Sequence, residues 1–281
     1  MFGRPSVVCA PVTPAMFSVV MDLTLRNAPA PGLNIRDSLF EAAVFCQARG
    51  MTVGASDPLD VSDVAQSAAT GDLAGDERID LIAAAAFERA RSHREGVVAD
   101  YIPVLAEADP EAFGLCIADV DGGLHEVGDT TATFSIQSIS KAFVYALLCE
   151  QIGHESVREI VGVNNTGLAF NSVVAIELND GHPMNPMVNA GALATTALMP
   201  GSSGPQQWGA VHDGLSRFAG RELVVDDVVY RSESETNHRN RAIAQLLYSY
   251  GRITRDPAEV VDVYTRQCAL LVDARDLAVM G

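Results

Sequence analysis

A serine and a lysine lie three residues apart in one short stretch, FSIQSISKAF at residues 134–143. Lys141 in this stretch is the only lysine of the chain, although Lys and Arg together number 19. Arginine serves wherever a positive charge alone is needed, whereas lysine can lose its proton when it is buried. A lysine retained at one position therefore indicates that a deprotonatable amine is needed there.

Helical spacing would bring Ser138 and Lys141 together, because residues three apart share one face of a helix. A neutral amine beside a hydroxyl activates the serine as a nucleophile. In the first helical turn, Ser138 would also lie near free backbone N–H groups that stabilise developing negative charge. A chance S-x-x-K pair is the alternative. The single lysine and the apolar AFVYALL that follows it favour the catalytic interpretation, because burial lowers the pKa of a lysine.

The elements around this pair predict an α+β domain, because two antiparallel strands are followed by helices. Residues 114–128 read as two strands joined by the turn Asp121-Gly122-Gly123, which predicts a β-hairpin. Apolar periodicity predicts helices on both sides of this hairpin. The predicted helices cover residues 77–93, residues 97–113 as far as Pro110, and residues 134–153 with an end at Gly153.

The second half of the chain predicts further helices. Residues 183–199 turn around Pro186 and then enter an apolar helix. Residues 232–251 are polar at first and amphipathic afterwards. Residues 257–281 predict a pair of helices with a break near Asp273.

The first 75 residues are expected to form an N-terminal extension of unknown role. Residues 38–48 have helical spacing of apolar side chains. Residues 51–75 are rich in Asp, Ala, Ser and Gly, which is typical of a linker. We therefore expect the main domain to start near Asp76 and to cover residues 76–281.

Charge and composition exclude several classes of function. A formal net charge of −17 argues against nucleic acid or an anionic membrane as partner, because phosphate binding needs clustered Lys and Arg. Five cysteines without a CxxC pair indicate reduced thiols and a cytoplasmic location, and no leader of the secretory type opens the sequence. The six histidines lack metal-ligand spacing, so we expect neither a metal nor another cofactor.

Several separate motifs resemble those of the serine-dependent glutaminases, and they occur in that family's order. They are FSIQSISK, NPMVNAGAL, SESETNHRN and DVYTRQCAL, and the resemblance runs from about Asp76 to Gly281. It implies the fold of the serine β-lactamases and transpeptidases, with an antiparallel sheet flanked by a helical region. It also implies homo-oligomers and L-glutamine as substrate.

The resemblance implies a role for eight residues. Ser138 would be the nucleophile that attacks the side-chain amide of glutamine, with its backbone N–H as half of the oxyanion hole, and Lys141 would be the base. A carboxylate suits the α-ammonium of glutamine, whereas amides and tyrosine hydroxyls suit its carboxylate and amide. The implied substrate-binding residues, besides Ser138, are Tyr101, Gln137, Asn189, Glu233, Asn240 and Tyr264.

Structural roles are the alternative for most of these residues. Asn189 could cap the helix that follows it, and Glu233 and Asn240 could be ordinary residues at a helix start. Tyr101 and Tyr264 could be core aromatic residues.

The family's domain continues beyond DLAVMG with further strands of the sheet, a proton-shuttling tyrosine and a strand that supplies the second oxyanion donor. None of these is present in the sequence, so we expect a C-terminally incomplete domain with weak or no activity. Loss of one oxyanion donor costs about 3 kcal/mol of transition-state stabilisation.

Two other functions stay open. One is a different S-x-x-K hydrolase acting on β-lactams or peptidoglycan, although such enzymes work outside the cytoplasm and need an export signal. The other is a non-catalytic partner that binds glutamine or assembles with a complete subunit.

Overall fold

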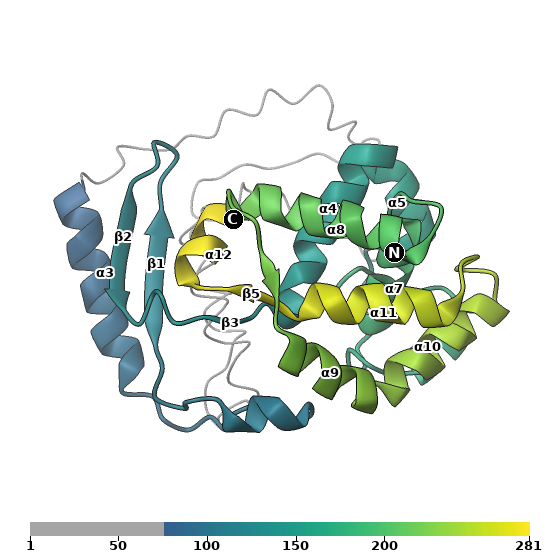
Figure 1. Cartoon of the computed structure of the whole chain (residues 1–281), viewed down its shortest axis with the longest axis horizontal. Helices are drawn as coiled ribbons and strands as arrows, with labels where there is room; N and C mark the ends of the chain where they lie inside the picture. Colours follow the sequence, from purple (N-terminus) through teal and green to yellow (C-terminus); the bar gives the residue numbers. More distant parts are fainter. Residues whose placement is uncertain (1–75) are drawn as a thin grey trace, which may run out of the picture.

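The structure, a computed structural model, describes residues 76–281 (Figure 1). The helix predicted at residues 38–48 and the linker predicted at residues 51–75 lie outside the described residues. A domain boundary near Asp76 stays a prediction.

The predicted hairpin is confirmed. Strands β1 (Gly114–Ala118) and β2 (Leu124–Gly128) pair antiparallel, with Gly114 opposite Gly128 and Ala118 opposite Leu124. Helix α3 (Asp76–Arg91) lies along one side of the hairpin and buries Phe87 against it (Figure 1). Gly128 has a φ of 78°, and a Cβ there would lie 2.4 Å from the Phe87 ring. The glycine therefore permits both the turn of the strand and the contact with the ring.

Helix α12 (Ala274–Met280) covers the hairpin from the other side. Ala278 of α12 packs with Cys116 and Ala118 of β1 in a small apolar cluster. The two-stranded sheet thus lies between α3 and α12 (Figure 1). Packing against these helices compensates for the lack of neighbouring strands within the described part of the chain.

A second sheet contains three very short strands in the order β3 (Phe134–Ser135), β5 (Leu270–Val272) and β4 (Val224–Val225). This sheet corrects two sequence predictions. The helix predicted to start at residue 134 starts instead after β3 and a 3₁₀ turn, and the predicted helix pair at 257–281 contains β5. Pairing explains both differences, because Phe134 opposes Val272 and the Ile136 N–H donates to the Leu270 carbonyl over 2.8 Å. Such contacts between distant segments override local helix propensity.

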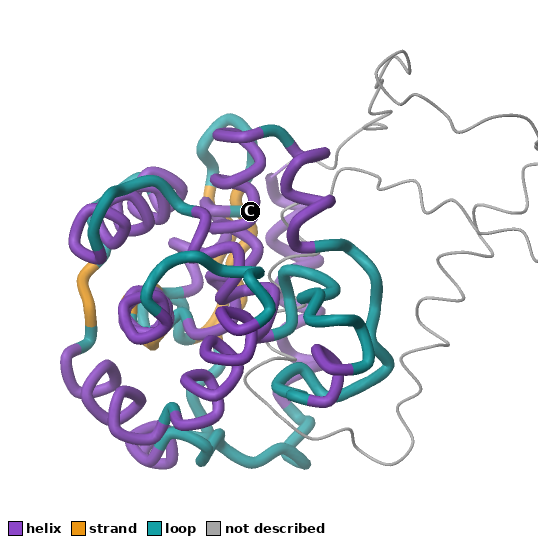
Figure 2. Tube along the Cα trace, turned by 90° about the vertical axis from the view of Figure 1, so that its right-hand side faces the viewer, coloured by secondary structure: helices purple, strands orange, loops and turns teal. Residues whose placement is uncertain are grey.

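Helices form most of the remaining described residues (Figure 2). Helix α7 (Asn189–Leu198) is central, since every one of its residues from Asn189 to Ala197 is buried. Helices α4, α10 and α11 pack directly against it. The bounds of the other elements are η2 (Pro103–Glu107), η3 (Gln137–Ile139), α4 (Ser140–Ile152), α5 (His154–Val161), α6 (Val174–Glu177), α8 (Gly204–Ala219), α9 (Asp227–Thr236), α10 (His238–Ser249) and α11 (Pro257–Cys268).

One other predicted helix differs in extent, and the stretch that is polar at first and amphipathic afterwards forms two helices. Residues 97–113 contain only η2, and residues 232–251 break at Asn237 between α9 and α10. The Asn237 side chain donates to Thr265 Oγ1 of α11 over 3.1 Å, which holds the break against a third helix. The result is an α+β fold that is mostly helical, with two small antiparallel sheets among residues 76–281. Within the same range, none of the helices combines the length and apolar character needed to cross a bilayer.

Candidate active site

Ser138 lies in the 3₁₀ turn η3, between strand β3 and helix α4, and not within the α-helix itself. Its side chain is exposed. Gln137, just before it, has a φ of 50°, a left-handed conformation that non-glycine residues seldom adopt. The Gln137 side chain is half-buried and donates to Ser135 Oγ over 3.0 Å. Strained backbone of this kind is common at functional sites, and here it presents Ser138 to solvent.

Lys141 lies one turn further on in α4 and is only 3% exposed. Its Nζ donates to the Met187 carbonyl over 2.9 Å and to Asn189 Oδ1 over 2.8 Å. Burial lowers the pKa of Lys141 to about 8, although the nearby Cys268 and Glu233 act in the opposite direction. The chain's only lysine is therefore poised to lose its proton not far above neutral pH.

Asn189 links Lys141 to a third helix. Its Oδ1 accepts from Lys141, and its Nδ2 donates to Asn240 Oδ1 over 2.8 Å. Three residues that the sequence singled out, on α4, α7 and α10, thus form one buried hydrogen-bonded chain. Asn189 is the first residue of α7, but no side-chain hydrogen bond caps that helix in the described structure. The geometry therefore favours a contact of Asn189 with Lys141 and Asn240 over a helix-capping role.

Glu233 of α9 is 6% exposed, and its Oε2 has no hydrogen-bond partner among the described residues. Burial raises the pKa of Glu233 to about 7, with Lys141 opposing this shift. A buried carboxylate oxygen without a partner is costly. Such an atom is a natural position for a cationic ligand group.

Tyr101 and Tyr264 both lie close enough to Glu233 to feel its charge. Tyr264 of α11 is fully buried and shares hydrogen bonds with Ser138 and Cys268, while burial raises its pKa well above the usual range. Tyr101 is 56% exposed as a residue, but its hydroxyl end is desolvated. This burial, followed by the influence of Cys268 and Glu233, raises the pKa of Tyr101 to about 12.

One difference from the expected pairing concerns Lys141 and Ser138. Among the described residues, Lys141 donates to Met187 and Asn189 and makes no hydrogen bond to Ser138, whose side-chain partner is Tyr264. All eight predicted residues nevertheless belong to segments that converge here, and electrostatic influence connects Lys141, Glu233, Tyr101 and Tyr264. Their individual roles stay predictions.

Sequence reasoning missed a buried polar chain behind Ser138. Gln267 Nε2 donates to Ser140 Oγ over 2.9 Å, and Ser140 Oγ donates to the Gln137 carbonyl over 2.7 Å. Gln267 and Cys268 follow Tyr264 by three and four residues on α11, and so they share its helix face. That spacing within DVYTRQCAL was the signal that could have found them.

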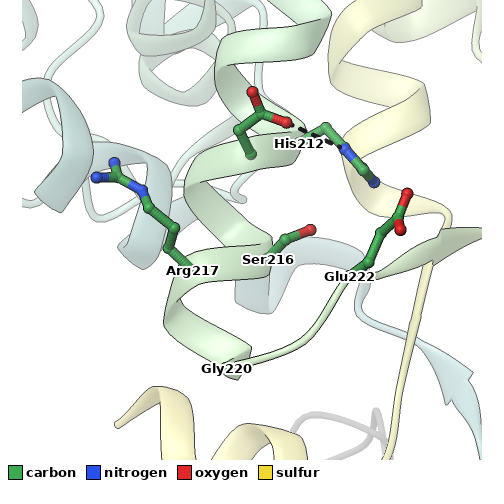
Figure 3. A pocket seen from close by; sticks show the side chains of 6 residues that line it. His212, Ser216, Arg217, Gly220 and Glu222 are labelled. Carbon is green, nitrogen blue, oxygen red and sulfur yellow. Dashed lines mark ion pairs between the residues drawn. The ribbon is translucent and has the colours of Figure 1, made fainter.

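A hollow among the described residues lies elsewhere, on the C-terminal half of α8 (Figure 3). It is open to solvent and measures about 580 Å³. None of the eight predicted residues lines it, so we do not assign the chemistry to it. The lining residues are His212, Asp213, Ser216, Arg217, Gly220 and Glu222.

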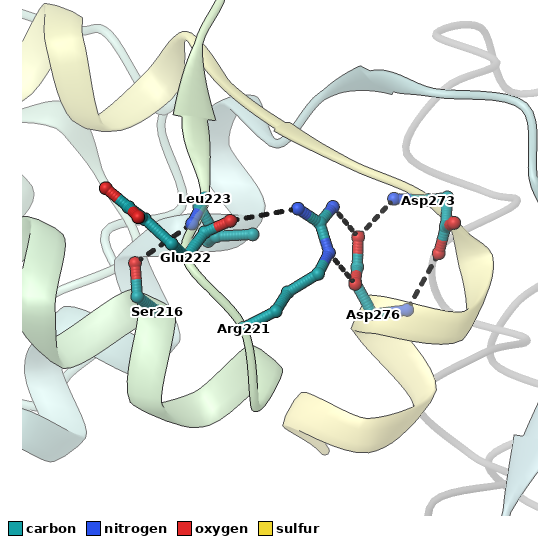
Figure 4. Close-up of polar contacts among 6 residues, drawn as sticks. All are labelled: Ser216, Arg221, Glu222, Leu223, Asp273 and Asp276. Carbon is teal, nitrogen blue, oxygen red and sulfur yellow. Dashed lines mark hydrogen bonds and ion pairs between the residues drawn. The ribbon is translucent and has the colours of Figure 1, made fainter.

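Beside this hollow, Arg221 and Asp276 form a contact that stabilises the fold (Figure 4). Arg221 donates from Nε to Asp276 Oδ1 over 2.7 Å and from an Nη to Oδ2 over 2.5 Å. Asp276 also completes a capping box with Asp273 at the start of α12. A bidentate pair with a largely buried carboxylate is a strong contact, and it fastens α12 to the end of α8.

The family model described as Glutaminase matches residues 96–281. The chain belongs to the glutaminase family. Glutaminase 2 of Yersinia pestis is 49% identical over 212 residues, which cover 75% of this chain and 62% of the relative. The glutaminase of Brucella abortus (strain S19) is 49% identical over 201 residues, covering 70% of this chain and 63% of the relative.

Solved structures agree with this family. The probable glutaminase ybaS matches with a TM-score of 0.72 and 39% identity, over 74% of this chain and 67% of that one. Mglu in its L-glutamate binding form matches with a TM-score of 0.66 and 40% identity, over 72% of this chain and 46% of that one. The chain spans about three fifths of the length of these curated relatives, at 62% and 63%.

Proposed function

We propose that this chain hydrolyses L-glutamine to L-glutamate and ammonia through a γ-glutamyl ester on Ser138. The observation that carries this proposal is the burial of the only lysine one helical turn from an exposed serine, in a chain of the glutaminase family. The finer assignment to the serine β-lactamase and transpeptidase fold is part of the proposal, supported by the S-x-x-K placement at the start of α4.

The substrate would be held by groups that lack partners of their own. Glu233 Oε2 suits the α-ammonium, because a charge-assisted hydrogen bond there would satisfy the orphaned carboxylate oxygen. Asn240 uses its amide oxygen for Asn189, which leaves its N–H groups to donate to the α-carboxylate. Mglu has been solved in an L-glutamate binding form, which supports glutamate as the product and ligand class here.

The contacts of Lys141 would orient it for proton transfer. A neutral amine has two N–H groups and one lone pair, and the Met187 carbonyl and Asn189 Oδ1 can accept both N–H groups. The lone pair is then left for the Ser138 hydroxyl, three residues away on the same face. Tyr264, hydrogen-bonded to Ser138, would hold the hydroxyl in place.

The steps of the reaction then balance. Ser138 Oγ attacks the side-chain carbonyl carbon of glutamine, and its proton passes to Lys141. The C–N bond breaks as that proton is delivered to the leaving nitrogen, which departs as ammonia. Water then attacks the ester, gives its proton through Lys141 to Ser138 Oγ, and releases glutamate.

The test is release of ammonia and glutamate from L-glutamine by purified residues 1–281, with L-asparagine for comparison. The unmodified chain should release both products and form a glutamyl adduct on Ser138 that mass spectrometry can map. The Ser138→Ala variant should release neither product and form no adduct. Labelled penicillin should not acylate Ser138. Equal rates with and without Ser138, or an adduct elsewhere, would refute the proposal. The absolute rate also tests the prediction, made from the sequence, that this chain has weak or no activity. Homo-oligomers and a cytoplasmic location stay predictions as well.

The value of kcat/KM should rise with pH in two steps. Lys141 must be neutral to accept a proton, and its pKa is lowered to about 8, so kcat/KM should fall tenfold per pH unit below 8. Glu233 must be ionised to bind an ammonium, and its pKa is raised to about 7, so the fall should steepen below 7. Initial rates at subsaturating glutamine between pH 6 and 9.5 measure this profile. A flat profile from pH 6 to 8 would contradict the assignment of Lys141 as base.

Gln267→Met tests the polar chain behind Ser138. Gln267 is buried and donates to Ser140 Oγ, which in turn holds the Gln137 carbonyl next to the nucleophile. We expect kcat to fall about tenfold with little change in KM, and stability to fall by about 1–2 kcal/mol. Ser140→Ala should have a similar effect, and the double variant should lose less than the sum because the residues act together. Gln151→Met, exposed at the end of α4, is the matched control.

A further inference from the structure

Three potential metal ligands meet between α3 and the hairpin. Asp76 opens α3, Asp119 follows β1 at the hairpin turn, and His125 lies in β2. One ligand atom from each lies within 4.8 Å of the others. These segments are at the end of the molecule away from α7, α10 and α11 (Figure 1). The cluster is therefore separate from the site around Ser138.

His125 is the decisive member of this cluster. It is only 5% exposed, and its Nε2 is buried without a hydrogen-bond partner among the described residues. Its Nδ1 lies 2.8 Å from Asp80 Oδ1 of α3. A carboxylate at that position holds the Nδ1–H tautomer, which leaves the Nε2 lone pair as a ligand. The Nε2 lies 4.0 Å from Asp119 Oδ2, on the side of the acidic groups.

Hydrogen bonds from the hairpin turn hold one carboxylate oxygen of Asp119, Oδ1, and the other oxygen, Oδ2, can bind a ligand. Its Oδ1 accepts from the Asp121 N–H over 2.8 Å and from the Gly123 N–H over 2.7 Å. A Cβ at position 123 would lie 2.3 Å from Oδ2, so only glycine leaves room for that oxygen. The turn thus fixes the carboxylate, and Oδ2 accepts no hydrogen bond from residues 76–281.

We propose that Asp76, Asp119 and His125 bind one divalent transition-metal ion of the Zn²⁺ type. One imidazole nitrogen with two carboxylate oxygens suits zinc, whereas Ca²⁺ and Mg²⁺ prefer oxygen ligands throughout. Tetrahedral zinc places its ligand atoms about 3.3–3.5 Å apart, so the cluster needs to contract by roughly 1 Å. Asp76 is exposed and can move, and water would supply the fourth ligand. The ion would fasten α3 to the hairpin.

The competing arrangement is a protonated His125 shared by two carboxylates. Such an imidazolium would donate from Nε2 to Asp119, but 4.0 Å is too long for a hydrogen bond. The scattered histidines had predicted no metal. Linear spacing does not reveal this cluster, because its three ligands come from segments that only the fold brings together.

The test is a calorimetric titration of the untagged, metal-stripped chain with Zn²⁺, accompanied by thermal unfolding. Asp119→Asn keeps the oxygen that accepts from Asp121 and Gly123 and replaces only the free one, so the turn should survive. Asp76→Asn changes an exposed residue. Asp121→Asn, exposed in the same turn, is the matched control.

We expect one saturable site and a higher Tm with Zn²⁺ in the unmodified chain and in Asp121→Asn. Affinity should fall more than a hundredfold in Asp76→Asn/Asp119→Asn, and about 10–100-fold in Asp80→Asn. Zinc X-ray absorption should show nitrogen and oxygen ligands at about 2.0–2.2 Å without sulfur. Absence of saturable binding, undiminished binding in the double variant, or sulfur ligation would overturn the proposal.

Discussion

Lys141→Arg is expected to lower glutamine hydrolysis by at least about a thousandfold. The substitution keeps a positive charge and hydrogen-bond donors beside the Met187 carbonyl and Asn189 Oδ1. It removes the ability to lose a proton, because a guanidinium stays protonated in proteins. A role in charge or packing would tolerate this change far better than a role in proton transfer.

The fall should be confined to the chemical steps. We expect L-glutamate to bind the variant within about tenfold of its original affinity, since Glu233 and Asn240 are untouched. Combining Lys141→Arg with Ser138→Ala should cost little more than either change alone, because a nucleophile and its base act as one unit. Arg158→Lys, on helix α5, is a control for exchange of the two cations. Lys141→Arg activity within tenfold of the original would remove Lys141 from the mechanism.

Local spacing predicts a chemical centre whose residue roles stay predictions, and it correctly predicts the hairpin. Ser138 and Lys141 were paired through their three-residue separation, and the hairpin was found through its turn residues. Helix periodicity failed at Phe134 and at Leu270, where strand pairing between segments more than a hundred residues apart decides the structure. Local patterns contain no information on such pairing.

The surroundings of the centre depend on long-range packing as well. The hydrogen-bonded chain from Lys141 through Asn189 to Asn240 joins three helices, and only the family motifs pointed to Asn189 and Asn240. The burial that shifts the pKa of Lys141 and Glu233 comes from the same packing. Residue types can therefore suggest an acid or a base, but the fold sets how strongly each is perturbed.

Glu233→Gln is expected to weaken binding of L-glutamate about a hundredfold while making the free protein more stable at pH 8. The binding loss follows from removing the charge that pairs with the ligand's α-ammonium. The stability gain follows from burial, which raises the pKa of Glu233 to about 7 from 4.5. Below pH 4.5 the carboxyl is neutral in both states; as pH rises to 7 the unfolded chain ionises freely and the folded one resists. Ionisation of Glu233 therefore lowers the stability of the folded protein, whereas a glutamine at this position stays neutral at every pH and has no such cost.

The advantage of Glu233→Gln should grow between pH 4.5 and 7 and level off above it, at about 1–3 kcal/mol. Urea unfolding at pH 4.5, 6 and 8 measures it, and calorimetry with L-glutamate measures the binding. Glu235→Gln, exposed on the same helix, should change neither quantity appreciably. A Glu233 kept for structural reasons would give the opposite pair of results, with lower stability at pH 8 and unchanged binding. Greater stability together with weaker binding is instead the signature of a carboxylate whose cost is offset only when an ammonium ligand arrives.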